Sequence, residues 1–429
     1  MKRLIPIVFL LLAAPAFADA ADPQRQYKLA IGDPARRDRE VPVPFDAIVD
    51  TATGDVVTPD ELAARLTGVR LLLLGESHTS TEFHRVQHRV LRALHEAGRR
   101  VLVGLEMYPY TEQRFLDQWR DGLLTEEGFL RLSRWYEHWG YHWMYYRDTF
   151  LFAREHQLSM YAVNTPRDVV AAVRKKGFAN LTAEEAAHIP KDIDVTSADH
   201  MTYFRSSFDE ADALHGGMTE DAWKSMLSAQ ATWDATMGYN AVQALARHPE
   251  PEAIMVVLVG FGHVAYGVGI ERQARTWFDG GIASLIPVPV LDSERAPIET
   301  VRASFANFVW GVASEADAAY PALGVSTTAA EGGRKVILVE KGSVGERAGF
   351  QVGDQLLKMD GTPVPDRESY SRLMAAKAWG DAATFLVRRG GEERTLVAHF
   401  RRSVPRAPAP PPAAKPPGDK KKPPAGAEP

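Results

Sequence analysis

Two distant stretches of this chain, residues 71–78 (LLLLGESH) and residues 255–263 (MVVLVGFGH), share one pattern. In each, an apolar run typical of a buried strand leads into a glycine-containing turn and then a histidine. A third apolar run, residues 101–105, ends on Glu106. Ligands of open α/β sheets lie beyond the carboxyl ends of the strands. The pattern therefore predicts one composite site at that edge of the sheet, made by two histidines and two acids.

The strand-like runs between residues 46 and 292 alternate with helical patterns. Such alternation predicts an α/β domain with a mostly parallel sheet and helices on both of its faces. Residues 177–249 are helical in pattern and directly precede the strand that leads to His263. This order along the chain predicts a helical insertion that covers the strand ends as a lid.

The two ends of the chain differ in composition from the rest. Residues 1–20 combine Lys2 and Arg3 with an apolar stretch and a small-residue cleavage pattern, which together indicate a secretory signal peptide. Residues 405–429 are rich in proline and lysine and are expected to form a disordered tail. No later apolar run of the sequence is long enough to predict a transmembrane helix. We expect a periplasmic protein, with secretion as the alternative.

Composition excludes several classes of chemistry. The chain has no cysteine, so it forms no disulfide, carries no lipidated cysteine and offers no thiolate ligand. Any metal would have to be held by histidine, tyrosine or carboxylate side chains. The formal net charge of −5 argues against a nucleic acid as the partner.

The residue types at the strand ends allow three interpretations. His78, Glu106 and His263 could ligate a divalent metal, since two imidazoles and a carboxylate with an open position suit a hydrolytic site. The same residues together with Glu76 could act without a metal, a carboxylate orienting a histidine as general base. Alternatively, the side chains form a buried hydrogen-bond network that joins the strand ends.

A second, small and mainly β domain is predicted over residues 320–402. Residues 342–350 (GSVGERAGF) and 353–361 (GDQLLKMDG) closely resemble the bacterial PDZ domain. In that family a loop before the second strand binds the C-terminal carboxylate of a peptide through backbone N–H groups. The matching loop here consists of Leu323, Gly324 and Val325. The resemblance implies a C-terminal peptide or a protein as partner, or else a module for packing or homodimerisation.

The first domain also resembles a known family. The segments that carry this resemblance are residues 75–78 with His84 and Gln87, 105–107, Trp139 with Tyr141 and Tyr146, 164–167, 229–234 and 260–270. They are similar, in the same order, to the ChaN-like haem-binding uptake family, whose superfamily includes the Tiki metalloproteases and the erythromycin esterases. The resemblance implies haem binding and a role in iron acquisition. Many members are lipoproteins, and this chain lacks the cysteine for that modification.

A haem site needs an axial histidine or tyrosine, an apolar slot and cations for the propionates. His200 and Tyr203 would share a helix face in the expected lid and are the predicted axial ligands. Tyr146 and Arg147 lie in an aromatic-rich stretch and are further candidates for haem contact. We therefore expect a protein that binds haem or a related iron porphyrin. The alternative is a metal-dependent hydrolase, either a protease or an esterase.

Overall fold

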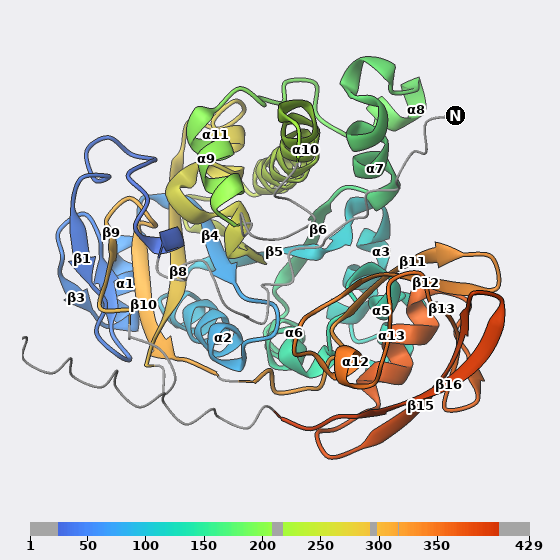
Figure 1. Ribbon diagram of the computed structural model, residues 1–429. Coiled ribbons are helices and arrows are strands. Elements are labelled where there is room, and N and C mark those ends of the chain that lie inside the picture. Colours follow the sequence, from blue (N-terminus) through green and yellow to red (C-terminus); the bar gives the residue numbers. More distant parts are fainter. Residues whose placement is uncertain (1–24, 208–217, 292–297, 316, 403–429) are drawn as a thin grey trace, which may run out of the picture.

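The computed structural model describes residues 25–207, 218–291, 298–315 and 317–402. Its first domain is built on a sheet in the order β3-β2-β10-β8-β4-β7-β5-β6 (Figure 1). The strands from β10 to β6 are all parallel, whereas β2 and β3 pair antiparallel at one end. The strands are β2 (Ile48–Asp50), β3 (Val56–Val57), β4 (Val69–Glu76), β5 (Arg100–Pro109), β6 (Ser159–Asn164), β7 (Ala253–Gly260), β8 (Gly281–Leu291) and β10 (Phe308–Ala313). The predicted mostly parallel sheet is confirmed.

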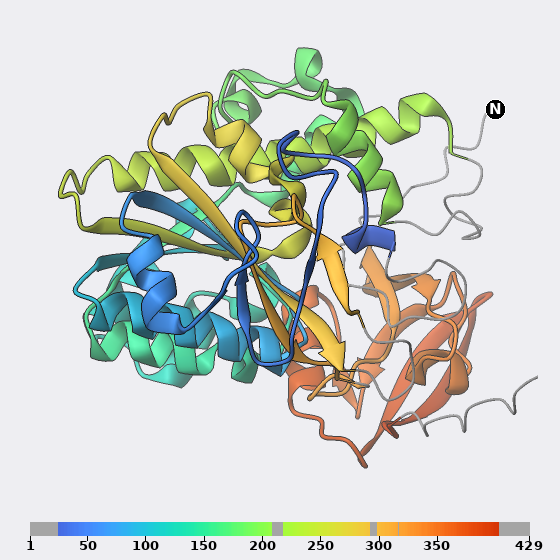
Figure 2. The same cartoon turned by 90° about the vertical axis from the view of Figure 1, so that its left-hand side faces the viewer.

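Helices cover both faces of this sheet, as Figures 1 and 2 show. On one face lie α2, α6 and several shorter helices, and on the other lie α7, α10 and α11. A separate antiparallel pair, β1 (Glu40–Pro42) with β9 (Thr300–Arg302), flanks the domain. The helices are α1 (Pro59–Arg65), α2 (Thr81–Glu96), α3 (Gln113–Arg120), α4 (Glu126–Leu132), α5 (Trp135–His138), α6 (Arg147–Glu155), α7 (Arg167–Lys176), α8 (Ala183–Ala186), α9 (Ala198–Ser206), α10 (Glu220–Leu245) and α11 (Ile270–Ala274).

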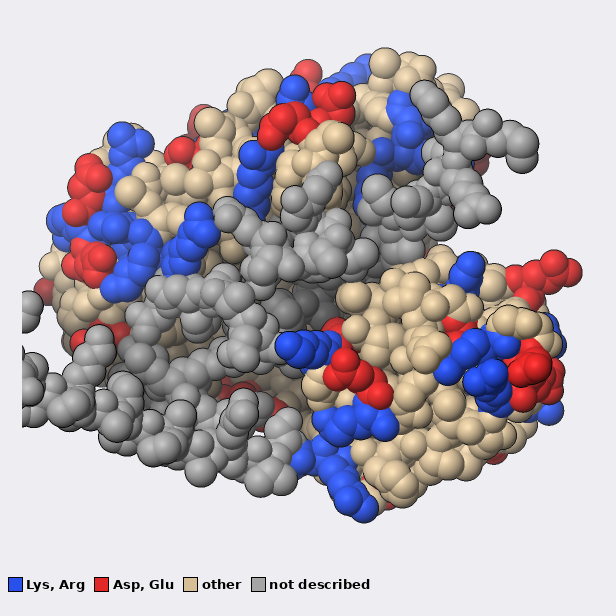
Figure 3. Space-filling model, in the orientation of Figure 1, with Lys and Arg blue, Asp and Glu red and all other residues tan. Residues whose placement is uncertain are grey.

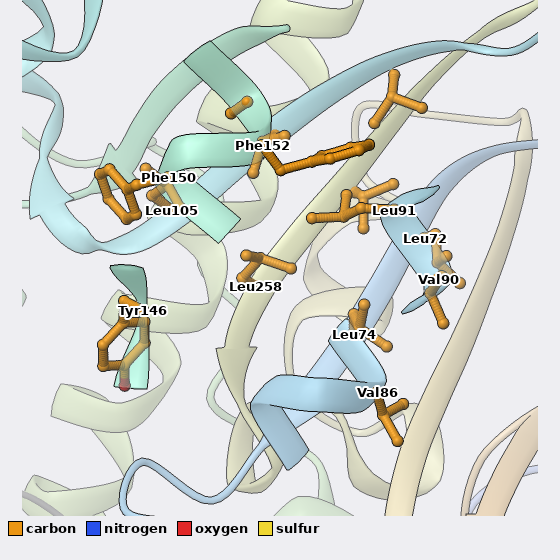
Figure 4. Close-up of a cluster of buried hydrophobic side chains, with 14 of the residues drawn as sticks. Leu72, Leu74, Val86, Val90, Leu91, Leu105, Tyr146, Phe150, Phe152 and Leu258 are labelled. Atoms are coloured by element: carbon orange, nitrogen blue, oxygen red, sulfur yellow. The ribbon is translucent and has the colours of Figure 1, made fainter. Parts of the chain in front are cut away.

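The central strands are apolar because both faces of the sheet are covered. Along β4, alternate side chains point to opposite faces. Leu72 and Leu74 join the cluster under α2, which Figure 4 shows, and Leu71 and Leu73 join the cluster under α10. The register of the parallel pair β4–β7 then places the ends of both strands, and with them both histidine segments, at one edge.

The helical stretch expected as a lid contains α8, α9 and α10 within the described residues. The C-terminal half of α10 packs Met237 and Ala241 onto one face of the sheet. The middle of α10 lies at the edge where the parallel strands end, and Gln230 and Asp234 enter the candidate site there. The sheet itself continues past residue 292, because β10 adds a further parallel strand beside β8.

The second domain has the strand order β11-β12-β13-β15-β16, with β14 beside β13 and β11 at one edge. Its core is formed by apolar residues that include Leu323, Val336 and Phe385. The two domains lie side by side, with charges of both signs interspersed on the face that Figure 3 shows. The elements are β11 (Val325–Ala330), β12 (Gly333–Val339), α12 (Val344–Arg347), β13 (Gln355–Met359), β14 (Thr362–Pro363), α13 (Arg367–Ala375), β15 (Ala382–Arg389) and β16 (Glu392–His399).

The expected signal peptide, residues 1–20, and the expected tail, residues 405–429, lie outside the described residues. Within the described ranges, no helix combines the length and the apolar character needed to span a bilayer.

Candidate functional site

Glu76, the last residue of β4, is a buried carboxylate with several donors around it. Its Oε1 accepts hydrogen bonds from His78 Nδ1 at 2.8 Å and from the Tyr146 hydroxyl at 2.7 Å. Its Oε2 accepts one from Gln87 Nε2 at 2.6 Å. Burial alone would raise the pKa of Glu76, but the charges of His84 and His78 and these hydrogen bonds lower it to about 2. Glu76 is therefore a carboxylate anion at neutral pH.

The imidazole of His78 lies just past the end of β4. Because a carboxylate can only accept, Nδ1 carries the proton that Glu76 binds, and Nε2 is left for another partner. A Cβ placed on Gly260, at the end of β7, would lie 3.2 Å from this Nε2. Burial lowers the pKa of His78, but the bond to Glu76 and the charge of Glu106 raise it above its usual value.

His263 repeats this arrangement from the neighbouring strand. It ends a single 3-10 turn (Phe261–His263) after β7, and its Nδ1 lies 2.5 Å from Asp234 Oδ1 on α10. Its Nε2 lies 3.5 Å from Glu106 Oε1, while Glu106 Oε2 accepts a hydrogen bond from the Gly260 N–H at 2.7 Å. Burial lowers the pKa of His263, but the charges of Asp234 and Glu106 raise it above its usual value.

Aromatic side chains line the same edge of the sheet. The ring of His78 packs against Trp139 and Tyr141, with centroids 4.8 and 4.9 Å apart. Trp233 packs edge-on to the ring of His263 at 6.4 Å. The site therefore combines two imidazoles, each oriented by an acid that raises its pKa, with aromatic side chains beside each ring.

Sequence reasoning missed the partners that orient His263. Asp234 and Gln230 lie on α10, and both contact His263. They belong to the stretch 229–234, which carries part of the family resemblance and lies in the expected lid. No local pattern indicates which strand end a helix will reach. Asp234 also contacts His200 from behind, at 3.4 Å between Oδ2 and Nε2.

Two parts of the chain match the models of known families. Residues 62–273 match the family model described as "Haem-binding uptake, Tiki superfamily, ChaN". The first domain belongs to this haem-binding family. Residues 321–399 match the model of the PDZ domain, which makes the second domain a PDZ domain. A search of curated proteins finds no match.

Solved structures give weaker likenesses to the two domains. A ChaN structure from Campylobacter jejuni, titled "Cofacial heme binding to ChaN", shares 16% identity at a TM-score of 0.44, covering 62% of this chain and 98% of its own. An HtrA-type protease AlgW with a decapeptide shares 24% identity at a TM-score of 0.19, covering 22% of this chain. A serine endoprotease from Yersinia pestis shares 21% identity at a TM-score of 0.17, covering 19% of this chain. The chain spans 33% and 29% of these two proteases.

The residues predicted as haem ligands lie inside the ChaN-like domain. His200 is 1% exposed and Tyr203 is 2% exposed, so a ligand at the sheet edge cannot contact either without a shift of α9. Tyr146 is buried, and its hydroxyl donates to Glu76. Arg147 instead forms an ion pair with Glu126 at 3.0 Å. By contrast, the side chains of His78 and His263 are 11% and 10% exposed.

The metal interpretation finds no support in the arrangement of donors in the ChaN-like domain. Among the described residues, no three histidine or carboxylate side chains are placed to hold one metal ion. Both carboxylate oxygens of Glu106 already have neighbours: Oε2 accepts a hydrogen bond from the Gly260 N–H, and Oε1 lies 3.5 Å from His263 Nε2. The divalent metal site predicted at His78, Glu106 and His263 is therefore not supported.

The loop of the PDZ domain has the backbone geometry of a tight turn. Gly324 has φ +66°, and a Cβ there would lie 2.3 Å from that of Ser343, so only glycine fits. Leu323 is buried in the domain core, and Val325 begins the edge strand β11. Within the described residues, we find no hydrogen bond donated by the Leu323 or Gly324 N–H. This loop lies where the sequence predicted it, and its ligand stays a prediction.

Proposed function

We propose that this chain is an exported haem-binding protein with a role in haem or iron acquisition, and that haem is held at the edge formed by His78 and His263. The match of residues 62–273 to a haem-binding family supports it. The observation that carries it is the pair of imidazoles at one edge, each with Nδ1 held by a buried carboxylate. Among the described residues neither Nε2 makes a hydrogen bond, although His263 Nε2 lies 3.5 Å from Glu106 Oε1. Haem would supply a ferric iron that accepts a nitrogen lone pair and two propionates that attract cations.

The residues at this edge suit such a ligand. A carboxylate on Nδ1 fixes the tautomer of an imidazole and makes Nε2 a better donor, as in many metal-ligating histidines. Trp139, Tyr141 and Trp233 provide aromatic surface for the flat face of a porphyrin. His78 or His263 would give up its Nε2 proton on becoming a ligand, so binding at this site releases a proton.

The test is a hemin titration of the full chain followed by the Soret band. We expect saturable binding in the unchanged protein and a loss of at least about tenfold in affinity in His78→Ala and in His263→Ala. His156→Ala removes an exposed histidine of the same domain and serves as the control. If the unchanged protein gives no more than the spectrum of free hemin, the proposal is refuted. If His78→Ala and His263→Ala bind hemin as tightly as the control His156→Ala, hemin is not held at this edge.

Export to the periplasm is proposed on the pattern of residues 1–20. Cell fractionation with a C-terminally tagged chain, followed by mass spectrometry of its N-terminus, tests it. We expect a processed protein in the periplasmic fraction, and an unprocessed protein in the cytoplasm would contradict the proposal.

The PDZ domain is proposed to bind the C-terminus of a partner protein along β11, with Leu323, Gly324 and Val325 at the carboxylate. A C-terminal peptide library presented to the full chain tests this. We expect binding that Gly324→Ala removes, because its Cβ would meet Ser343. Equal capture of amidated and free peptides would contradict a carboxylate site.

A further inference from the structure

The PDZ domain contacts the ChaN-like domain directly beside the candidate site. Helix α13 packs against α5, and its first residue, Arg367, is partly buried between the two domains. The guanidinium of Arg367 donates to the Trp139 carbonyl at 2.8 Å and to the Glu137 carbonyl at 3.2 Å. The N–H of Glu368 donates to Glu137 Oε2 at 3.1 Å. One side chain of the PDZ domain thus holds two carbonyls of the other domain.

The turn that Arg367 holds forms the aromatic wall of the site. Trp139 and Tyr141 flank Gly140, and both pack on the ring of His78. Gly140 has φ +83°, and a Cβ there would lie 2.6 Å from Arg367 Nη2. The guanidinium therefore occupies the space where a side chain of the turn would stand, so a larger residue at this position would have to displace it.

Two further contacts attach the segment that leads into the PDZ domain near His78. Glu315, in the segment between the domains, accepts hydrogen bonds from Ser80 Oγ at 2.5 Å and from the Glu82 N–H at 3.4 Å, at the start of α2. Tyr320 stacks on His142 with ring centroids 3.6 Å apart. The two loops that flank His78 are thus both tied to the PDZ side of the molecule.

We propose that Arg367 is a positioning residue for the ligand site: it holds the turn 139–141 against His78, so that the PDZ domain completes the wall of the site in the other domain. This inference rests on the proposed haem function. The two hydrogen bonds of Arg367 are made to the backbone carbonyls of Glu137 and Trp139, so Arg367 acts on the ligand site through the backbone of the turn. Tyr370 and Leu373 of α13 pack against the same PDZ core as Val325 of β11. A partner that moves α13 would therefore change hemin affinity, and hemin would change the affinity for that partner by the same factor.

The test compares hemin affinity in the full chain for substitutions on α13. Arg367→Ala is expected to weaken hemin binding by about tenfold, because the turn loses both hydrogen bonds. Arg367→Lys is expected to recover part of this loss, since an ammonium group can reach one carbonyl but not both. Arg372→Ala is the matched control: Arg372 pairs with Glu368 and lies 5.6 Å from the centroid of the Tyr136 ring on α5, but among the described residues it makes no hydrogen bond to the turn 139–141. Its loss should therefore leave hemin affinity unchanged.

A double-mutant cycle keeps the inference testable if a single variant is poorly folded. Gly140→Ala disturbs the same contact from the other domain, so its effect and that of Arg367→Ala should be strongly non-additive. Additive effects, or equal hemin affinity in Arg367→Ala and Arg372→Ala, would overturn the role of Arg367. Failure of the unchanged protein to bind hemin would instead refute the proposed function, so the two failures are distinguishable.

Discussion

Replacing Glu76 by Gln retains the size of the side chain and removes the charge that organises the site. Glu76 accepts from His78, Tyr146 and Gln87 and has no contact with solvent. In the variant, the amide nitrogen takes the place of one acceptor oxygen, and His78 faces a neutral group. We expect Glu76→Gln to destabilise the ChaN-like domain at neutral pH and to lower the pKa of His78.

The magnitude follows from the pKa of the carboxyl group. A pKa of about 2 in the folded chain, in place of 4.5, corresponds to about 3 kcal/mol at about 1.36 kcal/mol per pKa unit. Because the pKa of Glu76 is lower in the folded than in the unfolded chain, its ionisation stabilises the fold at pH values above about 4.5. That contribution is lost as the pH falls from about 4.5 towards about 2. The difference in unfolding free energy between the unchanged protein and Glu76→Gln should shrink over that window.

Urea unfolding of both proteins at a series of pH values measures this difference, with tryptophan fluorescence as the signal. Two-dimensional NMR of the histidine rings reports the accompanying fall in the pKa of His78. A destabilisation that stays constant from neutral pH to about pH 3 would refute the electrostatic reasoning and leave only a packing effect. An unchanged His78 pKa would show that Glu76 does not hold the imidazolium.

Three more outcomes are expected at this site. The hemin affinity should rise with pH through the raised pKa values of His78 and His263, because each loses its Nε2 proton on becoming a ligand; a titration across pH 5.5–9 in one buffer series checks this. Asp234→Asn should weaken hemin binding by about 10- to 100-fold, since Asp234 orients His263, and affinity equal to that of the unchanged protein would contradict this role. Gly260→Ala should lower the free energy of unfolding, measured in urea, by about 1–3 kcal/mol and should weaken hemin binding, because its Cβ would lie 3.0 Å from His78 Cε1. The control is Gly68→Ala, where a Cβ meets nothing within 4 Å.

The fold class and the edge of the site were readable from local pattern. The apolar run of residues 71–74 is buried on both faces, so its composition alone indicates a central strand. β7 ends at its glycine, Gly260, and β4 ends one residue after Gly75. Because parallel strands end at one edge, the pattern places His78 near His263. The order of turns and glycines likewise identified the PDZ domain. These signals are local because they arise from the burial period and the backbone conformations of neighbouring residues.

The partners of His263 and the other groups around Glu76 were decided only by the tertiary structure. Asp234 reaches His263 because α10 crosses the sheet at one particular register, and Tyr146 faces Glu76 instead of a ligand because α6 packs under the same edge. Arg367 meets the turn at Gly140 through a contact between two domains. Helix propensity and periodicity determine which face of a helix is apolar, but not which strand end that helix reaches. The register of long-range packing sets that choice, and it appears only once the whole chain is folded.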